Sequence, residues 1–125
     1  MDFIHTKNAP EPIGAYSQAV ATNNLIFLSG QIPLNPQTNE IEASDVRGQT
    51  EQVFQNITAV LKEAGCSLNQ VLKCTIFLTD INDFAIVNEI YASKFKEHTP
   101  ARSTIQVGAL PKGSLVEIEV IAEKA

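Results

Sequence analysis

Hydrophobic and polar positions in the first third of the chain follow the alternation that is typical of β-strands. Residues 16–22 alternate loosely, and residues 25–28 (LIFL) form a short apolar run. Asn23 and Asn24 between them are a turn signal, so the two segments predict a β-hairpin. Prolines and asparagines then cluster in residues 33–39, which predicts a turn-rich connection.

Residues from about 44 to 64 repeat their apolar positions every three or four residues, as an amphipathic helix does. We expect Ser44 or Asp45 to cap this helix, and Gly65 to end it in the left-handed conformation. Its buried stripe is Val46, Thr50, Val53, Phe54, Ile57, Val60, Leu61 and Ala64. Gly48 inside the helix costs about 1 kcal/mol relative to alanine, which indicates close backbone packing there.

A second helix is expected to start at Asp80 or Asn82 and to end before Pro100, whose ring cannot continue a helix. Its apolar face consists of Phe84, Val87, Tyr91 and Phe95. Asn88 lies on the same face, one turn from two of these aromatic residues. An unsatisfied buried amide costs about 1–3 kcal/mol, so Asn88 needs partners. It either ties down a loop or takes part in function.

Three further strands are predicted at residues 71–78, 105–107 and 116–122. Residues 105–107 alternate as a half-buried strand does. In the last segment, VEIEVIA, the apolar residues at 116, 118 and 120 face one way, and Glu117 and Glu119 face the other way with Ile121.

This order of elements predicts an α+β domain, in which a sheet carries both helices on one face. The other face would be bare, and a small domain normally buries an apolar uncovered sheet face in an oligomer.

Composition narrows the class of protein. The 125 residues are 44% hydrophobic and 18% charged, which suits one compact domain spanning residues 1–125. The net charge of −5, without a basic stripe, argues against non-specific nucleic-acid binding. The N-terminus, MDFIHTKNAPEP, has neither the basic nor the apolar region of a signal peptide, and no apolar run approaches membrane-spanning length. We therefore expect a cytoplasmic protein.

Cys66 and Cys74 are the only cysteines, and in a cytoplasmic chain we expect them to be free thiols. Cys74 lies inside an apolar strand pattern and is expected to pack in the core. His5 and His98 are far apart in sequence, so no local metal-ligand spacing is present and no metal is expected.

Arg102 stands where the chain enters the strand after Pro100. It is either a solvated arginine whose stem covers apolar surface, or a guanidinium held on a rigid element to bind a carboxylate in two parallel hydrogen bonds. Spacing alone favours the solvated arginine. Glu117 has a similar ambiguity: a carboxylate on a strand usually points at water, but becomes a candidate acid or base where a partner covers its face.

The segment PARSTIQVGALPKGSLVEIEVIA (residues 100–122) closely resembles the signature segment of the RidA/YjgF family of reactive-intermediate deaminases. IGAYSQAV, LIFLSGQIPLNPQTNEI and FLTDINDFAIVNEIY resemble the family's other blocks, so the resemblance covers nearly the whole chain. It implies a fold like that of chorismate mutase, with a mixed sheet and two helices on one face. It also implies a homotrimer whose sheets face a central barrel-like core, with clefts between subunits.

The same resemblance implies cofactor-free hydrolysis of 2-imino acids, or of enamine tautomers such as 2-aminoacrylate and 2-aminocrotonate, to 2-oxo acids and ammonia. Pyridoxal-phosphate-dependent dehydratases supply these compounds. By position, Arg102 matches the family's substrate-carboxylate anchor, and Glu117 matches the carboxylate that handles water. The residues that match other cleft positions are Tyr16, Ser29, Gly30, Asn88 and Thr104.

Two positions depart from the family's pattern. Ala15 stands where many members have proline, which is expected to loosen the tyrosine loop. Thr104 stands where some members have cysteine, so no thiol nucleophile is available there, although its backbone can contact substrate.

Two other functions stay open on the sequence. A trimeric binding module for small carboxylates would use the same Arg102 pocket and is not separable from an enzyme by sequence. An endoribonuclease or translation inhibitor is the second alternative, and the acidic charge balance counts against it.

Overall fold

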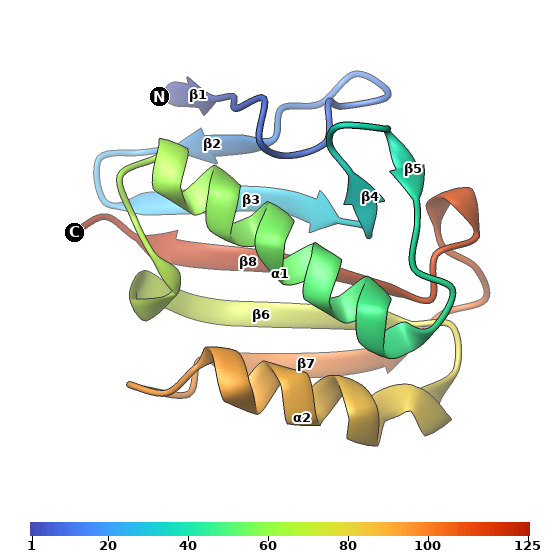
Figure 1. The fold of residues 1–125 in the computed structure, drawn as a ribbon. Coiled ribbons are helices and arrows are strands. Elements are labelled where there is room, and N and C mark those ends of the chain that lie inside the picture. The colour runs from blue at the N-terminus through green and yellow to red at the C-terminus, as the bar shows by residue number, and fades with distance from the viewer.

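The computed structural model describes residues 1–125 and consists of one sheet with a layer of helices on one side (Figure 1). The helices are α1 (Val46–Glu63) and α2 (Phe84–Lys94). Six strands lie in the order β1-β2-β3-β8-β6-β7. Their bounds are β1 Asp2–Ile4, β2 Ala19–Ala21, β3 Leu25–Gln31, β6 Val71–Leu78, β7 Ala101–Gln106 and β8 Val116–Glu123. The predicted α+β arrangement is confirmed.

The sheet is mixed, as expected, because β7 runs parallel to β6 while the other neighbouring strands are antiparallel. The predicted hairpin around Asn23 and Asn24 is formed by β2 and β3. However, β2 is shorter than residues 16–22, so Tyr16 lies in the loop before it. The predicted turn-rich connection contains a small separate hairpin of β4 (Leu34–Asn35) and β5 (Glu40–Ile41).

Helix α1 begins where the sequence indicates. Asp45 is its N-cap, since the Asp45 carboxylate accepts a hydrogen bond from the Gly48 backbone N–H at 2.8 Å. Close packing at Gly48 is also confirmed, because a Cβ there would lie 2.7 Å from the Cβ of Ala43. Gly65 follows the helix with φ +80°, the predicted left-handed conformation.

Helix α2 starts differently from the prediction. Asp80 caps a short 3₁₀ turn, Ile81–Asp83, by accepting from the Asn82 N–H at 2.9 Å. The α-helix itself follows at Phe84 and has no side-chain cap. Two other 3₁₀ turns lie at Leu68–Gln70 and Pro111–Gly113. Neither α-helix is of the length and apolar character that crossing a membrane requires.

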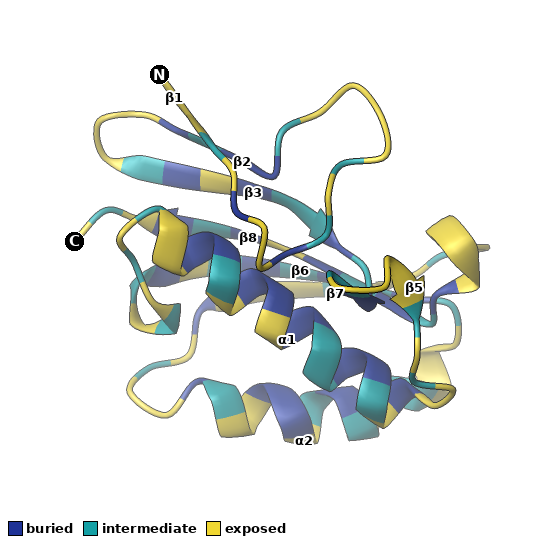
Figure 2. Ribbon diagram, turned by 45° about the horizontal axis from the view of Figure 1, so that its top comes forward, coloured by how far each residue is buried: buried dark blue, intermediate teal, exposed yellow.

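The hydrophobic core lies between the two helices and the sheet (Figure 2). Phe54 of α1 meets Tyr91 of α2 and Phe95, the residue that follows α2, edge-on, with ring centroids about 6 Å apart. Alternate residues of β6 and β8 point into this layer: Cys74, Ile76, Leu78, Val116, Ile118 and Val120. The prediction that Cys74 packs in the core is confirmed.

The opposite face of the sheet carries no helix (Figure 1). Glu117, Glu119 and Ile121 of β8 lie on it, as predicted from their alternation. The prediction of a half-buried strand near residues 105–107 is wrong for this chain alone: five of the six residues of β7 are exposed. The strand is exposed because β7 is an edge strand with only one neighbouring strand. In addition, Ile105, which is 46% exposed, pairs with Phe77 on the bare face of the sheet.

Candidate functional site

The site residues expected from the sequence fall into two groups on opposite faces of the sheet. One group lines a cavity of about 530 Å³ on the bare face, whose lining includes Tyr16, Ser29, Gly30, Glu117 and Glu119. The other group lies beside α2, around a cavity of about 350 Å³ that is lined in part by Asn88, Tyr91 and Arg102.

The first group depends on an irregularity in β3. The pairing of β3 with β8 shifts in register between Leu28 and Gln31, so Ser29 and Gly30 leave the regular ladder. Such bulges bend a strand and redirect its side chains, and they are frequent beside active sites. Here the bulge lies next to Glu117.

The Glu117 carboxyl group packs against the backbone of Gly30. A Cβ at position 30 would lie 2.8 Å from Glu117 Cδ and still closer to Oε2, so only glycine leaves room for this carboxyl. Burial raises the pKa of Glu117, and the negative charge of Glu119 raises this pKa further. A carboxyl group with a raised pKa exchanges protons more readily near neutral pH, as a general acid or base must.

Ser29 holds the loop that carries Tyr16. Its hydroxyl donates to the Ser17 carbonyl at 2.6 Å, and its backbone N–H donates to the Gln18 carbonyl at 2.9 Å. The hydroxyl hydrogen of Ser29 is therefore used in a hydrogen bond within the chain, so toward a ligand the hydroxyl oxygen can only accept a hydrogen bond. Tyr16 itself is 52% exposed at the cavity.

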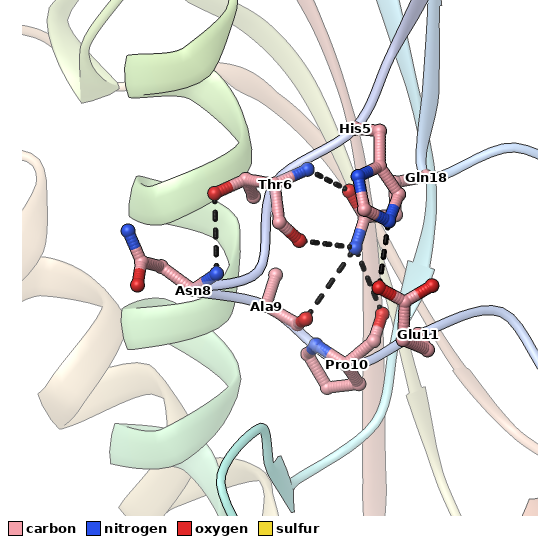
Figure 3. A network of polar contacts seen from close by, with 7 residues as sticks. All are labelled: His5, Thr6, Asn8, Ala9, Pro10, Glu11 and Gln18. Atoms are coloured by element: carbon pink, nitrogen blue, oxygen red, sulfur yellow. Dashed lines mark hydrogen bonds and ion pairs between the residues drawn. The ribbon is translucent and has the colours of Figure 1, made fainter.

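A second anchor of this loop is the buried side chain of Gln18 (Figure 3). Its Nε2 group donates to the carbonyls of Thr6 at 3.0 Å and Pro10 at 2.9 Å, while its Oε1 atom accepts from the Thr6 N–H at 2.7 Å. The N-terminal segment before Tyr16 is thus fixed by one amide. Sequence reasoning missed this role, since a single glutamine in a loosely alternating segment gives no signal of its partners.

Arg102 is held by residues of α2. Its Nη1 group donates to Asn88 Oδ1 at 2.7 Å, and its Cζ atom lies 4.8 Å from the centre of the Tyr91 ring. The partner that Asn88 was expected to need is therefore Arg102 and not a loop. Arg102 forms no ion pair with a carboxylate of this chain. Its remaining N–H groups are available to an outside anion.

Thr104 follows on the same side of β7 as Arg102. Gln106, two residues further on that side, accepts a hydrogen bond from the Ile81 N–H at 2.8 Å, which shows that this side faces the 3₁₀ turn before α2. Thr104 is half-buried and lies outside the linings of both cavities.

Arg102 and Glu117 do not meet within one chain. Strand β6 separates β7 from β8, and Arg102 pairs with Cys74, which points into the helix layer. Glu117 pairs with Phe77 on the bare face. Each chain therefore carries two candidate half-sites, one with a cation and one with a carboxylic acid.

Glu119 is a cavity residue that the sequence analysis placed on the same face as Glu117 without assigning it a role. The spacing of two along β8 was the available signal, because residues i and i+2 of a strand share a face. No group of three His, Cys, Asp or Glu side chains is arranged to hold a metal ion.

Comparisons with known proteins agree with this fold. The family model described as Endoribonuclease L-PSP matches residues 6–124. A rat 2-iminobutanoate/2-iminopropanoate deaminase is 48% identical over 95% of this chain and 87% of its own. The chain belongs to this family, the RidA/YjgF family, as its signature segment indicates.

Solved structures place the fold in the same family. A Yersinia pestis protein, YyfA of the Rid family, is 53% identical with a TM-score of 0.96, and the match covers 98% of both chains. E. coli TdcF, solved with bound serine, is 44% identical with a TM-score of 0.95, and the match covers 100% of both chains. The chorismate-mutase-like fold expected from the resemblance is confirmed.

Proposed function

We propose that this protein hydrolyses reactive 2-imino acids, and their enamine tautomers, to 2-oxo acids and ammonia without a cofactor. The observation that carries the proposal is the state of Arg102. Asn88 fixes one of its nitrogen atoms, and its other N–H groups have no partner in the chain. A planar guanidinium presented in this way matches the planar carboxylate beside the C=N carbon of a 2-imino acid.

Glu117 carries out the proton transfers of the reaction. With the substrate carboxylate on Arg102, a water molecule attacks the C=N carbon and gives a proton to the Glu117 carboxylate. This addition converts the substrate to a carbinolamine. Glu117 then returns that proton to the amine nitrogen, and the C–N bond breaks. The hydroxyl proton leaves with ammonia as ammonium, so one iminium ion and one water yield one 2-oxo acid and one ammonium ion.

The rate enhancement required of this site is modest, because protonated imines already react with water. A barrier lower by about 3–5 kcal/mol corresponds to roughly two to four powers of ten in rate. Positioning of the substrate together with one acid–base group is sufficient for that range. Tyr16 and the bulge at Ser29 and Gly30 would hold the reacting carbon in register.

We further propose that the complete site forms between copies of the chain in a homotrimer. The two half-sites lie on opposite faces of one sheet, and the bare face exposes apolar residues such as Phe27, which is 43% exposed. Arg102 lies on the edge strand β7, so packing this edge against the bare face of the next copy would bring Arg102 of one subunit toward Glu117 of the other. Sedimentation should show one species near three times 13.6 kDa.

A carboxylate-binding module is the second candidate, and the relative solved with bound serine favours it, since serine also carries a carboxylate. An endoribonuclease, named in the family description, is less well supported because the chain has a net charge of −5 and no basic stripe.

A coupled assay separates these functions. A threonine dehydratase generates the imine, and release of ammonia and 2-oxobutanoate is followed with and without the purified protein. Acceleration supports the deaminase. Binding of 2-oxobutanoate without acceleration supports the binding module, and cleavage of RNA with no effect on imines supports the nuclease.

Variants of the two half-sites sharpen the assay. Arg102→Lys keeps the charge but loses the planar fork, so it should weaken 2-oxobutanoate binding about ten- to a hundredfold, as loss of one hydrogen bond to a charged group does. Glu117→Gln should leave that binding largely intact but slow ammonia release by about two powers of ten or more. Arg47→Lys is the matched control, since Arg47 is the other arginine and forms an exposed pair with Glu89 on α2. Parent-like binding and turnover by Arg102→Ala would refute the carboxylate-anchor role.

A further inference from the structure

The guanidinium group of Arg102 lies against two aromatic rings of α2. Its Cζ atom is 5.2 Å from the centre of the Phe84 ring and 4.8 Å from that of Tyr91. A guanidinium within about 6 Å of a ring centre is attracted to the ring's negative face. Asn88, which accepts from Nη1, lies between these aromatic residues on the same face of the helix. Three side chains of one rigid element therefore contact one guanidinium.

The Tyr91 ring is itself buried and closely packed. Only 4% of Tyr91 is exposed, and its ring packs against Phe95 with centroids 4.7 Å apart. Its hydroxyl is buried without a regular hydrogen-bond partner, next to the thiol of Cys74. Cys74 is the residue that pairs with Arg102 across the strands. The ring thus has packing contacts besides the guanidinium.

We propose that Phe84 and Tyr91 are positioning residues that set the plane of the Arg102 guanidinium, with Asn88 fixing its rotation. This inference rests on the proposed function, in which the remaining N–H groups receive the substrate carboxylate. A long arginine side chain otherwise loses conformational freedom when it binds a ligand, and that loss lowers affinity. The aromatic contacts remove much of this loss before the ligand arrives. Neither ring has to touch the reacting atoms.

The first test measures the order of the arginine directly. Nitrogen-15 relaxation of the Arg102 Nε–H group is recorded without ligand in the parent, in Phe84→Leu and in Tyr91→Phe. Phe84→Leu removes a ring but keeps apolar volume, so the Arg102 side chain should become more mobile. Tyr91→Phe keeps the ring, so the mobility should match that of the parent. Phe3→Leu, at an exposed position on the far edge strand β1, is the matched control.

The second test measures ligand recognition. Phe84→Leu should weaken 2-oxobutanoate binding and raise KM by about two- to fivefold, the range of one exposed cation–π contact, while kcat stays within about twofold. In an Arg102→Ala background, Phe84→Leu should lower kcat/KM no further, because the group that it orients is gone. A structural role would lower kcat/KM by the same factor in both backgrounds.

The two tests fail in different ways. If the parent neither binds 2-oxobutanoate nor hydrolyses imines, the proposed function is wrong, and the relaxation data still decide whether the rings order Arg102. If the parent is active but Phe84→Leu leaves both the Arg102 relaxation and KM unchanged, the positioning role is wrong.

Discussion

The carboxyl group of Glu117 occupies the space that a side chain at position 30 would need. Gly30 lies in the β3 bulge, and an added Cβ would lie 2.8 Å from Glu117 Cδ. The sequence resemblance assigned Gly30 to the cleft lining, and the structure adds a physical reason: the glycine makes the room in which the acid–base group lies.

Gly30→Ala should therefore displace the Glu117 carboxyl and lower imine hydrolysis by about two powers of ten or more, the typical contribution of one general acid or base. The position has no positive φ, so the backbone accepts alanine and the loss should come from the clash alone. Gly108→Ala is the matched control, because nothing lies within 4 Å of a Cβ there. Parent-like turnover by Gly30→Ala, in folded protein, would show that the position of this carboxyl is unimportant.

A mixing experiment tests whether Arg102 and Glu117 act from different subunits. Arg102→Ala and Glu117→Gln are each expected to be nearly inactive alone. When the two are refolded together in equal amounts, about one quarter of the sites between subunits would combine an intact arginine with an intact glutamate. Activity should then recover to about a quarter of the parent's. A mixture as inactive as its components, with mixed trimers shown by mass spectrometry, would place both residues in one subunit's site.

The raised pKa of Glu117 sets an expected pH profile. Because the carboxylate form takes the proton of water, kcat/KM should fall as pH decreases through this raised pKa, above the ordinary glutamate value of 4.5. Glu119→Gln removes the neighbouring negative charge, which is the second cause of the shift. The acid limb of the pH profile, where kcat/KM falls, should therefore move to lower pH. The limb should stay above the ordinary value, because burial is the larger cause. Glu123→Gln, an exposed glutamate at the end of β8, should leave the limb in place.

The same shift affects stability. The folded state holds the Glu117 proton more tightly than the unfolded chain does, so the free energy of unfolding should fall as pH rises from the ordinary pKa of 4.5 through the raised value. In Glu117→Gln the side chain at position 117 does not titrate, so the free energy of unfolding should not show this fall. Melting midpoints of the parent and of Glu117→Gln, compared between about pH 4 and pH 8, measure the difference. Parallel curves across this range would contradict the shift.

The two cysteines should take no part in turnover. Burial raises the pKa of the Cys74 thiol to about 11, so the reactive thiolate is scarce at neutral pH. Cys66 is half-buried, lies outside the linings of both cavities, and should react first with a thiol reagent. Mass spectrometry should show one label in the native protein and two after unfolding, with imine hydrolysis kept by the singly labelled protein. Loss of activity on labelling Cys66 alone would contradict this expectation.

The sequence by itself determined the local elements, because their signals are carried by neighbouring residues. The spacing of apolar positions in α1, the cap at Asp45 and the left-handed Gly65 are set within one segment of chain. The alternation that puts Glu117 on the face opposite Ile118 is local in the same way. The candidate roles of Arg102 and Glu117 came from matching a family signature, which composition and spacing could not have supplied.

The tertiary structure alone decided which of these residues meet. Asn88 and Arg102 come from a helix and an edge strand, and their 2.7 Å hydrogen bond exists only because α2 packs over β7. The Gly30 backbone and the Glu117 carboxyl meet because β3 and β8, distant in sequence, are neighbours with a bulge between their ladders. Strand order likewise separated Arg102 from Glu117, since β6 lies between their strands and they face opposite sides. Pairing of distant strands is a non-local contact that depends on the packing of the whole chain, so a local pattern of residues does not decide which strands become neighbours.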